Sequence, residues 1–451
     1  MKLLATVLAV AVGATVLAIS VGAGSSKSAA PTYYQDVKPI LDGRCTGCHY
    51  TGGIAPFSLT SYEQAYQARR AIAAAVSLRL MPPWLAAADG PRYRHDPSLT
   101  REQIDLIAGW AATGRRGDAA KPAPALPSVS PRLSRVDLRL PMPAAYTPRR
   151  RDGADDYRCF VLPWSPKAQT FVTGVDVTPG QAREVHHMIL YLAAPASGAT
   201  LKRWDAADSG AGYGCYGGPS ATGAAEGLAT PQFLAGWVPG SAGGDFPAGT
   251  GIAVPRGAHL ILQVHYNLDY ADPQPDRSVV ELSTAARVDR RAFYLPLVNP
   301  IWVFSPKTFV IPKGRARVVH DFGADVGAIM SFLGPELDLR GGFEIDGVLL
   351  HMHRLGRSGE IAVERAGGGR ESLLSIPRWS FHWQREYDLA EPVDVSPGDR
   401  LTIRCVHDNS AGNQPLLRGG HAPPRRVIWG EDSSDEMCIG FLYITARSTQ
   451  R

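Results

Sequence analysis

The feature that most constrains the fold of this chain is a series of short β-branched runs between glycine and proline turns, from about residue 136 onward. Runs such as "QTFVTGVDVTPG", "HLILQVHYNLDY", "FEIDGVLLHMH" and "MCIGFLYITA" have the length and residue types of β-strands. This pattern is typical of β-sandwiches, and the region is long enough for two of them in tandem. We therefore predict two all-β sandwich domains, at residues 146–289 and 290–451.

Residues 1–30 predict export of the protein. Lys2 precedes an apolar run at 3–21, and small and polar residues follow, as in a secretory signal with a cleavage point after Ala23 or Ala30. The run is long for a signal peptide, so an uncleaved membrane anchor is the alternative. Both interpretations predict a periplasmic or secreted protein, held at the membrane in the second case, with its cysteines in an oxidising compartment.

The charge pattern gives no reason to expect a nucleic-acid partner. The net charge of +5 is modest for 451 residues, and the basic residues are scattered along the chain. A nucleic-acid-binding protein would concentrate them in a patch or stripe. The length itself predicts more than one domain, because it exceeds what a single ordinary core holds.

The stretch "CTGCH" at 45–49 has the form of the attachment motif for c-type haem. The thiols of Cys45 and Cys48 would form thioethers to the porphyrin, and His49 would become the proximal iron ligand. A redox disulfide or half of a zinc site is the alternative, but the histidine directly after the motif and the lack of a second CxxC argue against both. Met81, in "LRLMPPWL", is the predicted distal ligand, with His95 as its rival.

Two helical patterns flank this motif. "YQDVKPILDGRC" precedes it, and "LTREQIDLIAGWAATG" follows with a threonine–glutamine capping box and a terminal glycine. The segment resembles small class I-like cytochrome c domains, so we predict a small all-α, cytochrome c-like haem domain at residues 31–118. The proline-rich stretch "DAAKPAPALPSVSPRL" then predicts an extended linker, assigned to residues 119–145.

Four stretches in the predicted sandwiches carry side chains that bind soft or borderline metals. They are "REVHHMILY", "LQVHYN", "LLHMHRLG" and "SSDEMC", which contain His186, His187, His265, His351, His353 and Met437. Taken alone, each histidine pair could also be one surface and one buried residue. Imidazole suits several metals, whereas a thioether favours copper and above all Cu(I), and a structural zinc site would normally be closed by cysteines. The set predicts two different copper sites.

The order of these four motifs resembles that of the copper type II, ascorbate-dependent monooxygenases. The resemblance covers roughly residues 150 to 447 and extends to "DDYRCFVLP" and to the "GWVPG…FPAGTG" region. It implies two jelly-roll-like domains that face a cleft, with one copper on each. It also implies that the first copper stores and passes electrons, and that the second binds dioxygen and attacks the substrate.

The resemblance assigns roles residue by residue. The electron-transfer copper would be held by His186, His187 and His265. The catalytic copper would be held by His351, His353 and Met437. The disulfides would be Cys159–Cys215 and Cys405–Cys438, the second of which would fix the segment next to the thioether ligand.

Three positions depart from the peptide-hydroxylating members of that family. Leu349, Ile439 and Phe441 stand where those enzymes have polar residues that recognise a substrate carboxylate. A buried carboxylate would be costly to leave unpaired. These apolar substrate-pocket candidates therefore predict a small organic substrate without a carboxylate.

The fused haem motif predicts the source of electrons. Inserting one oxygen atom of O₂ into a C–H bond requires two external electrons, and a tethered haem, itself reduced by an external donor, would supply them one at a time. We therefore predict an exported copper monooxygenase with two copper ions and one haem c. The alternative functions are a non-catalytic copper-binding or electron-transfer protein and a redox sensor.

The remaining histidines are predicted to be structural or to lie on the surface. They are His259, His320, His382 and His407. His421, in "RGGHAPP", falls where the family has a glycine-rich loop near the catalytic end, and it is a candidate for contact with the ligands of the catalytic copper.

Overall fold

The computed structural model describes most of the chain from residue 30 to residue 447. The positions left out within that range are 54, 127–132, 151–154, 223, 225–226, 229–230, 239–242, 270–271, 334–336, 338, 340 and 418–419. The signal or anchor predicted at residues 1–30 therefore lies almost wholly outside the described residues. Among the helices of the described part, none is both long enough and apolar enough to cross a membrane.

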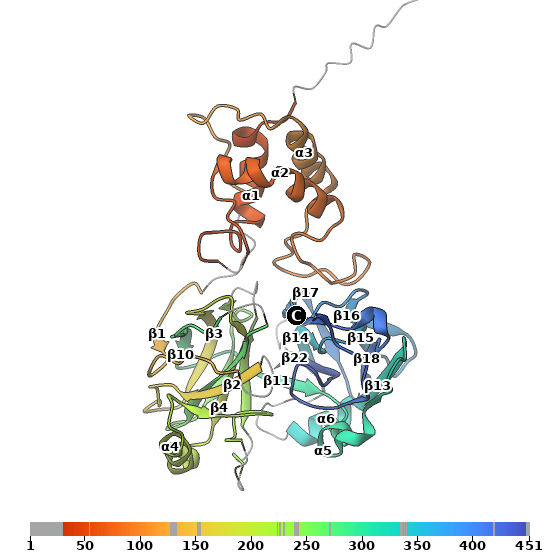
Figure 1. The fold of residues 1–451 in the computed structure, drawn as a ribbon. Coiled ribbons are helices and arrows are strands. Elements are labelled where there is room, and N and C mark those ends of the chain that lie inside the picture. Colours follow the sequence, from red (N-terminus) through yellow and green to blue (C-terminus); the bar gives the residue numbers. More distant parts are fainter. Residues whose placement is uncertain are drawn as a thin grey trace, which may run out of the picture.

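The first β unit contains a five-stranded sheet (Figure 1). Its strands in spatial order are β5 (Tyr213–Gly214), β2 (Asp155–Val161), β9 (His259–Asn267), β4 (Val185–Ala193) and β6 (Gln232–Trp237). Helices η2 (Pro195–Ser197) and α4 (Gly198–Ala207) follow β4. Alternate side chains of these strands pack on the neighbouring sheet around Met188, Leu262 and Val264, which are all buried.

That neighbouring sheet has nine strands and runs through both halves of the chain. Its main path is β1 (Leu138–Pro141), β10 (Val279–Ala285), β3 (Thr170–Thr178), β8 (Thr250–Val254), β11 (Arg290–Leu297), β22 (Ile439–Ala446), β14 (Phe343–His351) and β17 (Tyr387–Val395), and β7 (Gly244–Asp245) pairs with β3. Strand β11 joins the two halves, because it pairs parallel with β8 and antiparallel with β22. The sheet therefore crosses the boundary expected at residues 289 and 290.

The second β unit is completed by a four-stranded sheet over the other half of the nine-stranded one. It consists of β13 (Val318–Asp325), β18 (Arg400–His407), β15 (Gly356–Glu364) and β16 (Arg370–Ile376). The short elements of this unit are α5 (Pro300–Phe304), η3 (Pro306–Thr308), β12 (Val310–Ile311), α6 (Val326–Leu333), η5 (Ala411–Asn413), β19 (Leu416–Leu417), β20 (Gly420–His421) and β21 (Val427–Ile428). Ile361, Ile403 and Leu442 are fully buried between the two sheets.

The N-terminal part of the described chain carries the remaining helices. They are η1 (Tyr33–Val37), α1 (Lys38–Arg44), α2 (Tyr62–Ser77) and α3 (Arg101–Thr113). As predicted, α3 begins with a capping box between Thr100 and Gln103 and ends at Gly114, which takes a left-handed φ of 66°. These helices share a small apolar cluster around Trp110 and lie above the two β units in Figure 1.

The predicted fold class, a small all-α domain followed by two sandwich domains, is wrong. The protein is mostly β, and the longest of its six described α-helices, α2, has 16 residues. Residues 78–100 contain no helix, so the described helices form no sizeable all-α domain. Because Pro82 and Pro83 have no backbone N–H and cannot continue a helix, the chain leaves α2 here, and Trp84 packs its ring against the second β unit.

The segment from residue 84 to residue 96, which we call the strap, fastens the N-terminal part to the second β unit. The backbone N–H of Ala87 donates to the carbonyl of Ser375 at 2.8 Å. The hydroxyl of Tyr93 donates to the carbonyl of Leu373 at 2.9 Å. Both acceptors belong to β16, so the strap lies along the edge of the four-stranded sheet.

The proline-rich stretch assigned as a linker is partly held by backbone hydrogen bonds. The N–H of Ala123 donates to the carbonyl of Tyr34, and that of Leu126 donates to the carbonyl of Pro39. Its last residues, Leu138–Pro141, form β1 and pair with β10.

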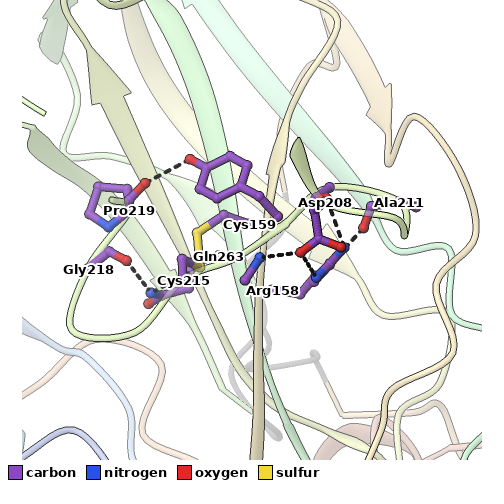
Figure 2. Close-up of a disulfide and its surroundings, with 11 residues drawn as sticks. Arg158, Cys159, Asp208, Ala211, Cys215, Gly218, Pro219 and Gln263 are labelled. Carbon is purple, nitrogen blue, oxygen red and sulfur yellow. Dashed lines mark hydrogen bonds and ion pairs between the residues drawn. A yellow bond between two sulfur atoms is a disulfide. The ribbon is translucent and has the colours of Figure 1, made fainter. Parts of the chain in front are cut away.

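Both predicted disulfides are present. Cys159 joins Cys215 in the first unit, and Cys405 joins Cys438 in the second. Figure 2 shows the first of them, with Gln263 donating to the carbonyl of Gly218 beside it at 2.8 Å. The disulfides tie short loops to central strands and fit the oxidising compartment expected for the protein.

Removing the second disulfide should lower the free energy of unfolding of the second β unit by about 4 kcal/mol, the chain-entropy value for its loop. The variant is Cys405→Ser with Cys438→Ser, which frees a loop spanning 33 residues. Urea unfolding with and without a reductant measures this. In reductant, which also opens Cys159–Cys215 in both proteins, the parent and the variant should have the same stability. Equal stability of the two oxidised proteins would contradict the prediction.

Candidate metal centre

A β-bulge explains why two adjacent histidines of β4 serve one site. Val185 pairs with Tyr266 and His187 pairs with His265, so His186 is an extra residue in the ladder between β4 and β9. A bulge re-aims the side chains around it, whereas neighbours in a regular strand point to opposite faces. The sequence could not reveal this, because the register depends on the partner strand.

The bulge brings three histidine side chains together. One ligand nitrogen from each of His186, His187 and His265 lies within 4.8 Å of the other two. The Nδ1 atom of His187 is 3.3 Å from the Nδ1 atoms of both other rings. A neutral imidazole carries only one N–H, so three nitrogens that converge in this way fit a shared cation such as copper.

The ring of His265 is held in its orientation by contacts at its second nitrogen, Nε2, and on its face. The Nε2 of His265 lies 2.9 Å from a carboxylate oxygen of Asp155, and the ring stacks on Tyr157 with 4.2 Å between centroids. Burial alone would raise the pKa of Asp155, but the hydrogen bond and charge of His265, followed by the hydrogen bonds from Ser433 and Asn267, outweigh it and lower that pKa. The carboxylate therefore stays charged and fixes the ring with Nδ1 free for a metal.

The second set begins at the end of β14. The rings of His351 and His353 have centroids 5.0 Å apart and lie nearly perpendicular. The Nδ1 of His351 pairs with the side-chain oxygen of Gln384 at 2.5 Å, and the Nδ1 of His353 pairs with the carbonyl of Asp435 at 3.3 Å. With both Nδ1 atoms engaged, each ring has its Nε2 available to a metal.

Glu436 ties these histidines to the methionine segment. Its fully buried carboxylate accepts hydrogen bonds from the backbone N–H of His353 at 2.9 Å and from that of Met437 at 3.2 Å. His407 lies behind this segment, 3.4 Å from the carboxylate and hydrogen-bonded to the carbonyl of Met437. The adjacent disulfide of Cys438 holds the same segment, so both sides of the second set are fixed.

His187 of the first set and His351 of the second line one cavity of about 410 Å³. The rings of His187 and His351 have centroids 6.5 Å apart, which brings the two units together at this point. The same cavity is lined by His353 and Met437, and by the substrate-pocket candidates Leu349, Ile439 and Phe441. Two metal ions bound to these sets would therefore share a single chamber.

Burial keeps His186, His187, His351 and His353 neutral at ordinary pH, because it lowers the pKa of each ring. Burial lowers the pKa of His186 and of His187 well below the usual value, and the charge of His265 lowers both further. Burial, followed by the charge of His353, lowers the pKa of His351 to about 3. Neutral imidazoles are the form that binds a metal, so these rings are prepared for coordination.

Several residues of the site had no signal of their own in the sequence. Gln384 and Phe381, whose ring stacks on His186 with 4.3 Å between centroids, come from the stretch before β17. Asp155 and Tyr157 belong to "DDYRCFVLP", which was noted only as a family motif. His407 was predicted to be structural, and it supports the methionine segment.

The other histidines outside the two sets have separate surroundings. The ring of His382 lies 6.4 Å from that of His186, and the Nδ1 of His320 is 3.4 Å from the Nδ1 of His407. His259 is close to the carbonyl of Pro195 at 3.4 Å. His421 pairs with the carbonyl of Gln414 at 2.9 Å, and its contact with the catalytic ligands stays a prediction.

The structure describes the side chains of the motif at residues 45–49 that was predicted to attach haem. Cys45 and Cys48 are free thiols, and the Nδ1 of His49 lies 3.1 Å from the carbonyl of Phe57. That hydrogen bond orients the ring and leaves Nε2 free, as an axial iron ligand requires. The exposed ring of Phe57 lies 4.8 Å from the ring of His49, measured between centroids. Two thiols and an oriented imidazole within one turn fit a covalent haem.

Comparison with known proteins relates the chain to the copper type II, ascorbate-dependent monooxygenases. Residues 335–450 match the family model described as the C-terminal domain of that family. This range contains the second candidate metal set and its disulfide. The match supports a copper-dependent monooxygenase function.

Named relatives agree with the family match. Mouse peptidyl-glycine alpha-amidating monooxygenase is 26% identical over 68% of this chain and 26% of its own length. Tyramine beta-hydroxylase of Caenorhabditis briggsae is 22% identical over 59% of this chain and 40% of its own length. Mouse DBH-like monooxygenase protein 2 is 26% identical over 58% of this chain and 38% of its own length. The chain spans between 26% and 46% of the length of the curated relatives it matches.

Copper binding to the metal-free protein should release almost no protons from histidines between pH 6 and 8. An unperturbed imidazole, with a pKa of about 6.5, is largely protonated at pH 6 and would have to lose that proton. The lowered pKa values of His186, His187, His351 and His353 mean that these rings are already neutral there. Calorimetry in buffers of different ionisation enthalpy counts the protons. A release of two or more at pH 6 would contradict this.

Proposed function

We propose that this chain is a two-copper monooxygenase that hydroxylates a C–H bond of a small organic substrate. The reaction converts R–H, O₂, two protons and two electrons into R–OH and water. The observation that carries the proposal is the cavity that His187 of the three-histidine cluster shares with the His–His–Met set, with 6.5 Å between the rings of His187 and His351. Two unequal ligand sets at one chamber suit electron storage at one metal and oxygen chemistry at the other.

The histidine-only set would hold the electron-transfer copper. His186, His187 and His265 offer nitrogen ligands alone, and Asp155 keeps the third ring oriented. His351, His353 and Met437 would hold the catalytic copper, because a thioether stabilises the reduced metal to which O₂ binds. Gln384 and Glu436 position these ligands through the hydrogen bonds described above.

The lining of the cavity supports a substrate without a carboxylate. Leu349, Ile439 and Phe441 line it with apolar side chains, and Glu386 and Asp388 place acidic groups on the same wall. Burial, followed by the charge of Asp388, raises the pKa of Glu386 to about 8. Glu386 is therefore largely protonated near neutral pH, and a carboxylate next to Leu349, Ile439 and Phe441 would lie against apolar surface, which disfavours its binding there.

We further propose that a haem c at Cys45 and Cys48, with His49 as its proximal ligand, delivers the electrons. When bound there, the haem supplies one electron at a time after reduction by an external donor. Met81 is the proposed distal ligand, with His95 as the rival. The two disulfides agree with a periplasmic or secreted location, where such a donor would be needed outside the cytoplasm.

Removing the histidines of the second set should take away one copper and abolish substrate-dependent O₂ consumption. The full-length protein should bind two copper ions, and the double variant His351→Ala, His353→Ala should bind one. Metal analysis and an oxygen electrode with ascorbate as reductant measure the two outcomes.

The matched control is His259→Ala, a histidine outside both ligand sets whose ring lies near the carbonyl of Pro195. It should keep two coppers and the parent rate of oxygen consumption. A double variant that still bound two coppers would refute the assignment of this site. A parent protein that binds two coppers yet never consumes O₂ would point instead to copper binding or electron transfer without catalysis.

A further inference from the structure

The strap holds the haem-attachment segment against the side of the second β unit that carries His351. In Figure 1 the loop between α2 and α3 reaches that unit near β16 and β17. At its start, the ring of Trp84 lies 4.8 Å from the ring of Tyr387 in β17. The guanidinium of Arg385 sits 5.0 Å from the centroid of Trp84. Trp84 follows the proposed haem ligand Met81 by three residues, so the contact begins next to the cofactor.

Arg385 is a half-buried cation whose guanidinium lies over the ring of Trp84, three residues from the proposed haem ligand Met81. It makes no ion pair with any carboxylate that the structure describes, and its Nε donates only a long hydrogen bond, 3.5 Å, to the carbonyl of Glu386. Burial raises the pKa of the Cys48 thiol, and the charge of Arg385 opposes that rise. A positive charge in this place favours any negative charge or electron that arrives beside it.

The residue before Arg385 makes the contact with the metal site. The side-chain oxygen of Gln384 lies 2.5 Å from the Nδ1 of His351. Both residues also line the cavity between the two ligand sets. One peptide bond therefore separates the residue whose side chain contacts Trp84 from the residue whose side chain holds His351.

We propose that electrons from the haem enter the copper pair at His351, through Arg385 and Gln384. This inference rests on the proposed function, and it differs from entry through the three-histidine cluster. Arg385 is a positioning residue: it connects Trp84 to Gln384, and its charge would favour the reduced form of a haem bound beside Trp84. An electron that follows this contact arrives at the His–His–Met set first and at His187 second, across the shared cavity.

The electron balance of each transfer is one for one. One ferrous haem becomes ferric while one Cu(II) becomes Cu(I). An external one-electron donor then returns the haem to the ferrous state, and two such transfers supply the two electrons of one hydroxylation.

Arg385→Ala tests the contact in the full-length protein that carries haem and copper. The reduction potential of the haem, measured by spectroscopic titration, should fall because a nearby positive charge is lost. Anaerobic stopped-flow oxidation of the ferrous haem by the bound Cu(II) should nevertheless slow by about tenfold or more, since the contiguous contact is broken. A lower haem potential by itself would make the haem a stronger donor and speed its oxidation by Cu(II). A slower oxidation therefore reports the loss of the Arg385 contact.

Two further variants separate charge from geometry. Arg385→Lys keeps the charge and should restore the haem potential toward that of the parent. Arg92→Ala removes an exposed strap arginine that pairs with Glu391, and it should change neither the potential nor the rate. An unchanged rate of haem oxidation in Arg385→Ala would overturn the inference. So would a loss confined to substrate affinity, which would make Arg385 a substrate-binding residue.

Variants that each retain one copper show at which ligand set the electrons from the haem enter. Rapid haem oxidation should persist when His186 and His187 are both replaced by alanine, and it should be lost in His351→Ala, His353→Ala. The reverse result would show that electrons enter at the three-histidine cluster. A protein without covalent haem in the pyridine haemochrome assay would overturn the haem proposal and this inference together. If haem and copper contents are normal but haem oxidation depends on His186 and His187 and not on His351 and His353, this inference is wrong and the haem proposal stands.

Discussion

The pairing of β11 with strands from both halves of the chain is the constraint on which the site depends. Because β11 pairs with β8 on one edge and β22 on the other, the two units share one sheet. Moving them apart would break backbone hydrogen bonds that a buried strand cannot replace. The histidines of β4 and β9 and those at the end of β14 are therefore held at one cavity, although they come from different units.

Side-chain chemistry made much of the site predictable from the sequence. Imidazole and thioether groups were recognisable from their residue types, and the family motif order correctly paired Cys159 with Cys215 and Cys405 with Cys438. The bulge at His186 was not predictable, because it is a property of the ladder with β9 and not of β4 alone. Gln384 was missed for a similar reason, since it stands 33 positions after His351 in the sequence and contacts it only in the folded chain.

The error in fold class has a physical origin in the strap. The helical patterns before and after the strap predict one all-α domain at residues 31–118, and this range includes Trp84 and Tyr93. These rings instead pack beside Tyr387, where they lie close to a large apolar surface that the short helices do not offer. The haem-attachment motif is consequently part of an N-terminal segment fastened to the β unit, which brings a proposed electron source next to the proposed metal cavity.

X-ray absorption at the copper edge tests the central claim, two coppers with unequal ligands, most directly. The sample is the reduced, copper-loaded protein with Cys45→Ser and Cys48→Ser, so that no free thiol remains among its cysteines. Because Met437 would supply the one sulfur ligand, we expect a copper–sulfur contribution equal to one sulfur per two coppers. It should disappear in the further variant Met437→Leu. A spectrum with nitrogen and oxygen ligands alone, or a sulfur signal that survives in Met437→Leu, would contradict it.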